Sequence, residues 1–371
     1  MRTVTLHTGR HSYDIIAGAG LLTTAGTLLY DRGFSGGKAV IVTDDRVNSL
    51  HGSTLKQSLE NSGFELLVIE VPSGEEQKSL ETAGRLYNEL TGFYAERNTP
   101  LLALGGGVIG DLTGFVAATY MRGVPLVQVP TTLLSQGDSS IGGKTAVNQG
   151  QLKNKIGTFY HPRLTISDIS TLSTLTPREL SNGLSEIIKH GLILDAGFFG
   201  YLEENMEKLR RLDPQVLEVA VSRSAEIKAR VVEQDELDTG LRNILNCGHT
   251  VAHAIESVSG MKTWHGEAVG LGLLIEARIS GELGIMDTSD IERLAAILEA
   301  ADLPLTIPEL EPQKLLDAMK HDKKVTEGRI RFALPRRIGE AVITDEVRTE
   351  IIKKALGREN EQAEDMRRNN E

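Results

Sequence analysis

The segment LLALGGGVIGD, residues 101–111, sets the pattern for the first half of this 371-residue chain. A short apolar run, typical of a strand, leads directly into Gly105, Gly107 and Gly110 with G-x-G-x-x-G spacing. Such a turn lets backbone N–H groups approach a pyrophosphate, because no Cβ atom stands in the way. A glycine turn that binds nothing is a common alternative, so the motif alone does not establish a nucleotide site.

The segments around this turn alternate between strand and helix patterns. The helical one is residues 75–90. The strand-like ones are short, β-branched and bounded by turn residues: KAVIVTDD (38–45), ELLVIEVP (65–72), VPLVQVP (124–130) and RLTISD (163–168). Alternation of this kind predicts a parallel sheet with crossover helices.

The pattern becomes helical near TPRE, residues 176–179, where a threonine cap precedes a proline at the first helical position. Helical spacing continues to about residue 300, and two short strands are expected in 328–335 and 339–344. We therefore predict an N-terminal Rossmann-like α/β domain with a parallel sheet, followed by a mostly α-helical C-terminal domain. The predicted ranges are 1–177 and 178–371, with a polar tail from about residue 357.

Composition narrows the class of function. The chain is 40% apolar and 25% charged, with a net charge of −11, which disfavours a general affinity for nucleic acid or an anionic membrane. Cys247 is the single cysteine, so no intrachain disulfide can form. No run of eighteen apolar residues suggests a membrane span. The cytoplasm is the expected location.

The acidic residues do not follow the standard dinucleotide-binding pattern. The ribose-binding acid expected about 20 residues after the glycine turn is missing there, where the chain reads VPLVQVP. Carboxylates instead end an earlier strand at Asp44 and Asp45, and Asp111 lies in the glycine turn. A dinucleotide would therefore contact this chain through different residues.

Cations and amides follow in DSSIGGKTAVN, residues 138–148, and shortly after it. Asp138 precedes Lys144 by six positions around a Gly-Gly turn, and Lys153 and Asn154 come next. In an acidic protein, such lysines are candidate anion ligands. A solvated loop lysine is the alternative for each one alone.

The helical half carries a second polar group. Glu186 and Lys189 are three residues apart, and His249 and His253 are four apart, so each pair shares a helix face. His265 opens the next helix. One carboxylate with two or three imidazoles suits a divalent metal, although a salt bridge and structural histidines remain the alternative. Spacing does not decide which histidines would be ligands.

Taken in order, these motifs strongly resemble the 3-dehydroquinate synthase family over roughly residues 38–335. The resemblance includes GEEQKSL, GGGVIGDLTGF, NGLSEIIKHGLI, RNILNCGHTVAHAIE and WHGEAVGLG. It implies zinc or cobalt bound by Glu186, His249 and His265, with His253 facing the substrate instead.

The resemblance also implies a bound NAD and a sugar-phosphate substrate. The residues implied for NAD are Asp44, Glu75, Lys78, Gly106, Gly107, Val108, Asp111, Thr131, Thr132, Lys144, Lys153 and Thr174. The residues implied for substrate binding and catalysis are Asp138, Lys144, Asn154, Lys189, Lys228, Arg242, Asn246, His253 and one of Lys323 and Lys324. Arg122 is implied to reach the site of a neighbouring subunit, so a homodimer is expected.

The implied reaction belongs to the shikimate pathway of aromatic amino-acid biosynthesis. It converts 3-deoxy-D-arabino-heptulosonate 7-phosphate to 3-dehydroquinate and phosphate by NAD-dependent oxidation, phosphate elimination, reduction and aldol closure. The alternatives are another sugar-phosphate cyclase, a metal-dependent polyol dehydrogenase or a non-catalytic protein with the same fold.

Three positions depart from the family pattern. The chain reads GQLKN at 150–154 where PLGKN is usual, Gly137 replaces an apolar residue before Asp138, and Arg46 stands where a small polar residue is common.

Overall fold

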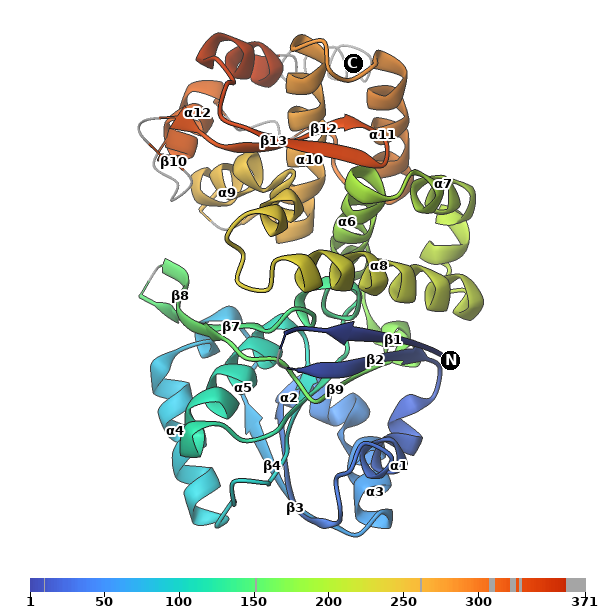
Figure 1. Cartoon of the computed structure of the whole chain (residues 1–371), viewed down its shortest axis with the longest axis vertical. Helices are drawn as coiled ribbons and strands as arrows, with labels where there is room; N and C mark the ends of the chain where they lie inside the picture. Colours follow the sequence, from blue (N-terminus) through green and yellow to red (C-terminus); the bar gives the residue numbers. More distant parts are fainter. Residues whose placement is uncertain are drawn as a thin grey trace, which may run out of the picture. The chain divides into compact units, whose positions relative to one another are not determined.

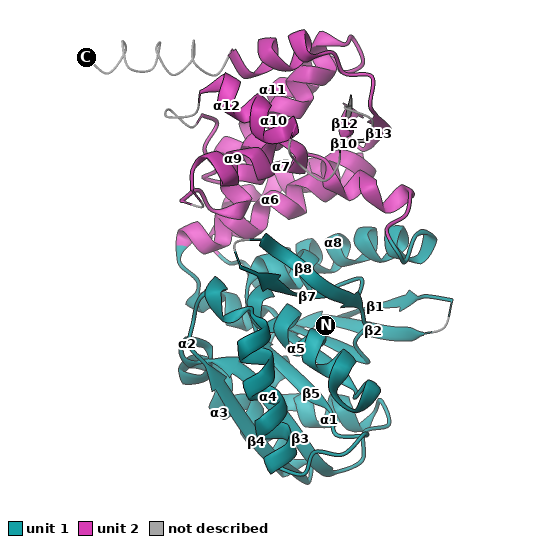
Figure 2. Ribbon diagram, turned by 90° about the vertical axis from the view of Figure 1, so that its left-hand side faces the viewer, with its two compact units in different colours: residues 1–176, 212–237 teal, residues 177–211, 238–371 magenta. Residues whose placement is uncertain are grey.

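The fold is seen in a computed structural model, which describes residues 1–9, 11–150, 152–260, 262–306, 311–320, 325–326 and 329–357. The chain divides into two compact units, coloured separately in Figure 2. The first unit is Met1–Thr176 with Leu212–Leu237, and the second is Pro177–Arg211 with Asp238–Glu371. We predicted two continuous domains, 1–177 and 178–371, with a single boundary after residue 177. That boundary stays a prediction, although contacts within the chain group Leu212–Leu237 with the first unit.

A seven-stranded sheet forms the centre of the first unit (Figure 1), in the order β1-β2-β9-β6-β5-β3-β4. Every pairing in it is parallel except the antiparallel pairing of β1 with β2. The strands of this sheet are β1 (Arg2–His7), β2 (Ser12–Gly18), β3 (Gly37–Asp44), β4 (Phe64–Val71), β5 (Leu101–Gly105), β6 (Leu126–Pro130) and β9 (Leu164–Asp168). The predicted parallel α/β fold is confirmed, including the five predicted strands.

Period-two alternation explains why the middle strands are buried on both faces. In β5, Leu101 and Ala103 pack with the side chains of α4 and α5, whereas Leu102 and Leu104 pack with those of α1 and α3. Both faces of a parallel sheet are covered by helices, so its central strands are continuously apolar. The helices that cover it are α1 (Ala25–Tyr30), α3 (Ser53–Asn61), α4 (Leu80–Gly92) and α5 (Gly107–Thr119).

Two further elements complete the first unit. The hairpin of β7 (Lys144–Gln149) and β8 (Leu152–Phe159) is antiparallel, with an irregular register between Val147 and Gln149. The sequence did not predict it. Helix α8 (Pro214–Gln234) packs its Ala225, Ala229 and Val232 against β1 and β2. It is capped by Asp213, whose carboxylate accepts from two backbone N–H groups.

The second unit is mostly helical, as predicted. Its strands, and its α-helices between Pro177 and Lys320, are α6 (Pro177–Leu194), α7 (Ala196–Arg210), α9 (His249–Val258), α10 (His265–Glu282), α11 (Thr288–Ala300), α12 (Pro312–Lys320), β10 (Val325–Thr326), β11 (Arg329–Ile330), β12 (Phe332–Arg337) and β13 (Glu340–Thr344). The two late strands were predicted from their sequence patterns, and the structure pairs β12 with β13 antiparallel. Helix α10 packs against both α6 and α9. The described residues include no helix long and apolar enough to cross a membrane. The polar tail beyond residue 357 lies outside the described residues.

Replacing Leu102 by alanine should test how far the first unit depends on its sheet. Leu102 is fully buried in β5, so the change should lower the free energy of unfolding by about 3 kcal/mol, measured by urea denaturation. Leu80→Ala is the control, because Leu80 is 47% exposed; its effect should stay within about 0.5 kcal/mol. Equal effects of the two changes would contradict this account of the core.

Candidate functional site: a glycine turn and a Glu-His-His cluster

Most of the residues predicted for NAD lie at one edge of the sheet. Asp44 is the last residue of β3, Glu75 and Lys78 follow β4, and Thr131 and Thr132 follow β6. The strands β6, β5, β3 and β4 are consecutive neighbours in the sheet and all parallel. Ligands of open α/β sheets bind beyond the carboxyl ends of such strands. The sheet therefore gathers these residues where a dinucleotide would bind.

The glycine turn after β5 has no room for side chains. A Cβ atom at Gly105 would lie 2.8 Å from Ile109, and one at Gly106 would lie 3.2 Å from the Thr132 methyl carbon. Gly106 caps α5, and as a glycine it has no side chain to accept from the first N–H groups of the helix. The turn thus presents backbone N–H groups and the positive end of a thirteen-residue helix, which suits a pyrophosphate.

A chain of hydrogen bonds connects the predicted residues of this edge. The Lys78 ammonium donates to Asp111 Oδ2 at 2.5 Å and also to the Asn154 side-chain oxygen. Asn148 accepts from the Asn154 backbone N–H at 2.9 Å and donates to Glu75 at 2.8 Å. Burial raises the pKa of Asp111, against the effect of the neighbouring Lys78. Asn148 was not predicted. It links the β7–β8 hairpin to the residues after β4.

A second polar pair of the first unit joins α8 to the segment before β7. Lys228 forms an ion pair with Asp138 Oδ1 at 2.7 Å and donates to the Asp138 carbonyl at 2.9 Å. Beside it, the Ser224 hydroxyl donates to the carbonyl of Gly137, one of the three departures from the family pattern, at 3.0 Å. Two predicted substrate residues, Asp138 and Lys228, are therefore in direct contact.

Four further predicted residues of the first unit have the following positions. Lys144 begins β7, and Lys153 is exposed on β8. Thr174 contacts His51 Nε2 at 3.2 Å. Arg122 is exposed beyond the far end of α5, about 20 Å from the glycine turn, because thirteen helical residues rise 1.5 Å each. Within one chain, Arg122 therefore does not join the residues at the carboxyl edge of the sheet.

The second unit brings one carboxylate and two imidazoles together. Glu186 Oε1 on α6 lies 3.4 Å from His249 Nε2 on α9 and 3.3 Å from His265 Nε2 on α10. One potential ligand atom from each residue falls within 4.8 Å of the others. Three ligands of this kind fit a divalent metal and leave a position open for substrate. The spacing of the sequence left the choice of histidines open, and the structure groups His265 with His249.

Burial and charge act differently on the two imidazoles. Burial lowers the pKa of His249 well below its ordinary value, against the attraction of Glu186. Burial also acts to lower the pKa of His265, but hydrogen bonds to Glu186 and Glu256 outweigh it and raise that pKa to about 9. Burial raises the pKa of the Cys247 thiol well above its ordinary value, and Cys247 lies outside the group of potential metal ligands found among the described residues.

The predicted substrate residues of the second unit surround this cluster only in part. Lys189 pairs with Glu186 one helical turn away, and the ring of His253 lies 5.6 Å from that of His249. Arg242 and Asn246 belong to the 3₁₀ segment Leu241–Asn246, directly before α9. Lys323 and Lys324 lie outside the described residues.

One contact of the cluster was missed at the sequence level. Glu256 Oε1 lies 3.4 Å from His265 Nδ1, the ring nitrogen that faces away from Glu186. Glu256 is seven residues after His249, so the same helical period that pairs His249 with His253 could have placed it on this face of α9. A partner of this kind orients a metal-binding imidazole.

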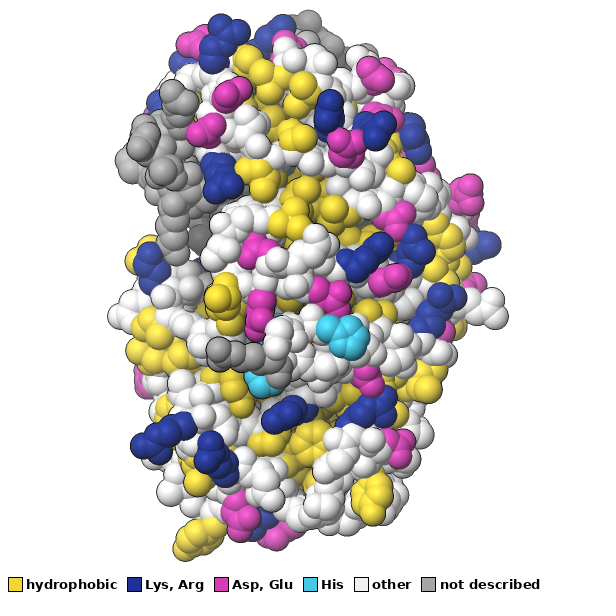
Figure 3. All heavy atoms as spheres, viewed as in Figure 1, with side chains coloured by type: hydrophobic (Ala, Val, Ile, Leu, Met, Phe, Trp, Pro, Cys, Tyr) yellow, Lys and Arg dark blue, Asp and Glu magenta, His cyan; other side chains and the backbone are white. Residues whose placement is uncertain are grey.

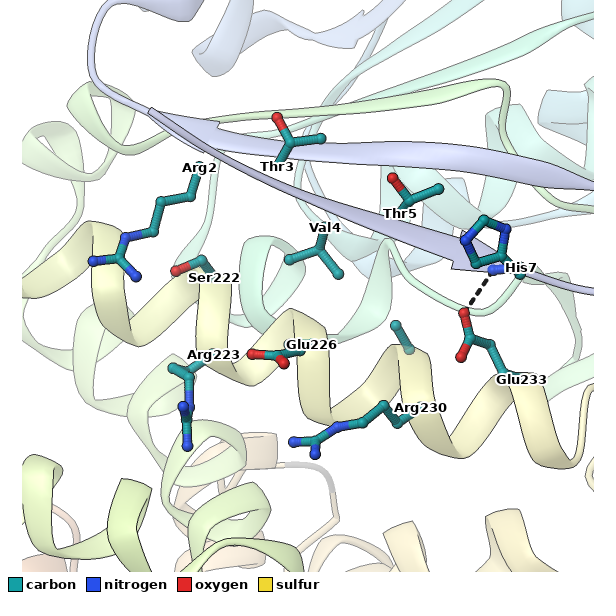
Figure 4. A pocket seen from close by; sticks show the side chains of 11 residues that line it. Arg2, Thr3, Val4, Thr5, His7, Ser222, Arg223, Glu226, Arg230 and Glu233 are labelled. Atoms are coloured by element: carbon teal, nitrogen blue, oxygen red, sulfur yellow. Dashed lines mark hydrogen bonds between the residues drawn. The ribbon is translucent and has the colours of Figure 1, made fainter.

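A further groove of the first unit lies away from the predicted residues. A groove of about 650 Å³ lies between β1 and α8 (Figure 4), where the His7 backbone N–H donates to Glu233. Arginines and glutamates share its walls, and its lining includes none of the predicted residues. Figure 3 shows basic and acidic side chains interspersed over one face of the molecule.

An α/β unit with a glycine turn, together with a helical unit that holds a Glu-His-His cluster, defines the class of the sugar-phosphate cyclases. Two solved cyclases share the fold over nearly the whole chain. A 2-epi-5-epi-valiolone synthase from Streptomyces hygroscopicus, solved with NAD⁺ and Zn²⁺, has a TM-score of 0.87 at 30% identity, covering 98% of this chain and all of its own. A 2-deoxy-scyllo-inosose synthase with carbaglucose-6-phosphate, NAD⁺ and Co²⁺ has a TM-score of 0.87 at 25% identity, covering 96% and 99%.

The chain belongs to the 3-dehydroquinate synthase family. Its residues 68–182 match the model of the 3-dehydroquinate synthase N-terminal region, and residues 183–325 match that of the C-terminal region. The 3-dehydroquinate synthase of Dehalococcoides mccartyi is 47% identical over 347 residues, which is 94% of this chain and 96% of the relative. The family resemblance expected from the motifs is therefore confirmed.

The cluster predicts different outcomes for two neighbouring histidines. His249→Ala should remove the bound zinc or cobalt, from about one ion per chain to near zero, because a two-ligand site binds such ions weakly. His253→Ala should keep the ion, since His253 is outside the cluster. Elemental analysis of the purified variants separates the cases. Loss of metal from both variants, or from neither, would contradict the assignment.

Proposed function

We propose that this chain converts 3-deoxy-D-arabino-heptulosonate 7-phosphate to 3-dehydroquinate and phosphate, with bound NAD and one zinc or cobalt ion. Membership of the 3-dehydroquinate synthase family supports the reaction. The observation that carries the metal-dependent part is the convergence of Glu186, His249 and His265. Location in the cytoplasm and a place in the shikimate pathway follow from the same proposal.

NAD would be held by the residues at the carboxyl edge of the sheet. The glycine turn and the N-terminus of α5 suit the pyrophosphate, and Asp44 and Glu75 supply acceptors for ribose hydroxyls. When bound, NAD supplies a hydride acceptor and the metal ion supplies Lewis acidity toward a substrate hydroxyl. Since the product carries no net oxidation, a pocket that keeps its NAD through the cycle suits the reaction.

Two of the lysines proposed to bind the substrate are each held by a carboxylate of their own unit. Lys228 is held by Asp138, and Lys189 is held by Glu186 beside the metal ligands. Each ammonium is therefore fixed in position before the substrate binds. A cation that is already in place can stabilise the charge of a departing phosphate without first having to reorient. Arg242, Asn246 and His253, with Lys144 and Asn154, complete the proposed substrate set.

We further propose a homodimer in which Arg122 acts at the site of the partner subunit. The segment that carries it supports this role. Met121 and Arg122 have positive φ angles of 47° and 64°, and Gly123 follows with a φ of 117°. Three residues in succession with positive φ hold the exposed Arg122 in an unfavourable backbone conformation. Strain of this kind often marks a functional segment, which supports a functional role for Arg122.

Supplying the heptulosonate phosphate with catalytic amounts of NAD should release inorganic phosphate over many turnovers, with no accumulation of NADH. Phosphate and absorbance at 340 nm are followed together, and metal-depleted enzyme is the control. Accumulating NADH would favour the polyol dehydrogenase instead. Turnover of a hexose 6-phosphate in place of the heptulosonate would favour a different cyclase.

Mixing two inactive variants tests the shared site. When Arg122→Ala is randomly mixed with His249→Ala, about one quarter of the sites should become active, because half the dimers are mixed and each has one complete site. Each variant alone provides the baseline, and native mass spectrometry verifies that mixed dimers form. Mixed dimers without recovered activity would show that Arg122 serves its own chain.

A further inference from the structure

A single peptide group connects a buried carboxylate to the metal cluster of the second unit. The Gly248 N–H donates to Glu276 Oε2 at 2.6 Å. The carbonyl of the same peptide group, that of Cys247, lies 3.3 Å from His249 Nδ1. The other ring nitrogen of His249, Nε2, faces Glu186. Both sides of this imidazole therefore have a defined partner.

Close packing holds this peptide group against α10, the helix that carries Glu276. Gly248 is left-handed, with a φ of 81°, and a Cβ atom there would lie 2.9 Å from Leu273. A Cβ atom at Gly272 would lie 2.1 Å from the Gly248 carbonyl oxygen. Gly272 and Glu276 are four residues apart and share a helix face. Gly272 thus lets the turn approach, and Glu276 binds its N–H. Figure 1 shows α9 and α10 together.

Stability alone does not account for Glu276. Its side chain is fully buried in α10, where a carboxylate is costly and an apolar side chain of similar volume is often as stable or more so. Glu276 also lies outside the group of potential metal ligands. Its carboxylate instead accepts from the Gly248 N–H and also contacts the Cys247 thiol, so both of these contacts lie within two residues of His249.

We infer that Glu276 is a positioning residue for His249, acting through the Cys247–Gly248 peptide group. The inference rests on the proposed ligand set. A peptide N–H bonded to a carboxylate makes the carbonyl of the same group a stronger acceptor. That carbonyl holds the proton of His249 on Nδ1, so the Nε2 lone pair is directed at the metal. At His265 a carboxylate contacts Nδ1 directly, with no peptide group between them, since Glu256 Oε1 lies 3.4 Å from His265 Nδ1.

The metal affinity of Glu276 variants provides the first test. Metal-free enzyme is titrated with Co²⁺ against a competing chromophoric chelator. Glu276→Met removes the acceptor at similar volume and should weaken binding about 10- to 100-fold, the usual cost of losing an outer partner of a ligand. Glu276→Gln keeps an uncharged acceptor and should weaken binding by less. Glu282→Gln is the matched control, because Glu282 lies on the same helix and pairs with Lys354; its affinity should equal that of the wild type.

The tautomer of His249 provides the second test and needs no metal. Two-bond ¹H–¹⁵N correlation spectra of the metal-free enzyme should show His249 protonated on Nδ1, with the resonance assigned by its loss in His249→Ala. In Glu276→Met the spectrum should shift toward a mixture of tautomers. In Glu282→Gln it should not change. A role of Glu276 confined to general stability would leave the tautomer as it is.

The outcomes separate this inference from the proposed ligand set. Wild-type affinity and an unchanged His249 tautomer in Glu276→Gln and Glu276→Met would overturn the inference, as would an equal loss in Glu282→Gln. If Glu276→Met fails to fold, Glu276→Gln decides by the same two measurements. If the wild type binds no metal through His249, the ligand set fails, while the tautomer measurement still reports on Glu276.

Discussion

The arrangement of the second unit depends on one buried carboxylate. The Glu186 side chain is 1% exposed, and it faces the Lys189 ammonium and the Nε2 atoms of His249 and His265. A carboxylate removed from water costs several kcal/mol, on the order given for buried ions, unless cations and donors surround it. Three separate helices supply these groups at one point. Apolar residues would fill that volume at a lower cost in free energy. The cluster is therefore best explained by the binding of a ligand.

Glycines explain how the three helices come close enough. A Cβ atom at Gly266 would lie 2.2 Å from the Asn182 carbonyl oxygen, so only glycine lets the start of α10 lie directly against α6. The Gly266 N–H then donates to the Asn182 side chain at 2.5 Å. In the same way, the missing side chain of Gly272 lets the turn before α9 lie directly against α10. His265 and His249 each lie directly beside one of these contacts, so the positions of the ligands follow from backbone packing as well as from their own side chains.

The parts of the fold that the sequence predicts are those with a local signal. Strands β3 to β6 are short apolar runs bounded by turns, and α6 begins with a proline after a threonine. The β7–β8 hairpin was missed because β8 is largely exposed and both strands carry a lysine and an asparagine, which are typical of loops. Leu212–Leu237 has an ordinary helical pattern, and nothing in that pattern says which unit the helix packs against.

The residues of the site were likewise predictable only where the sequence carries a local signal. Residues three or four apart on one helix, such as Glu186 with Lys189, could be paired from spacing. Joining Glu186 to two histidines of other helices required the resemblance to a known family, because tertiary contacts leave no periodic signal. The helical period could have placed Glu256 on the same face of α9 as His249, whereas Glu276 had no signal of either kind. A glutamate in a helix is usually a surface charge, and only the packing around α10 shows that these two are buried.

The same pairing logic extends through an acidic chain with few cations to spare. Among the residues that the structure describes, three lysines are buried, Lys78, Lys189 and Lys228, and each is paired with a carboxylate: Asp111, Glu186 and Asp138 respectively. All six were predicted as site residues. Pairing lowers the cost of keeping an ammonium inside the protein, and it fixes the cation where an anionic ligand can reach it. The net charge of −11 does not oppose the proposed phosphorylated substrate. Salt screens surface carboxylates that lie more than about 8 Å away, so groups close to the proposed site decide its local charge.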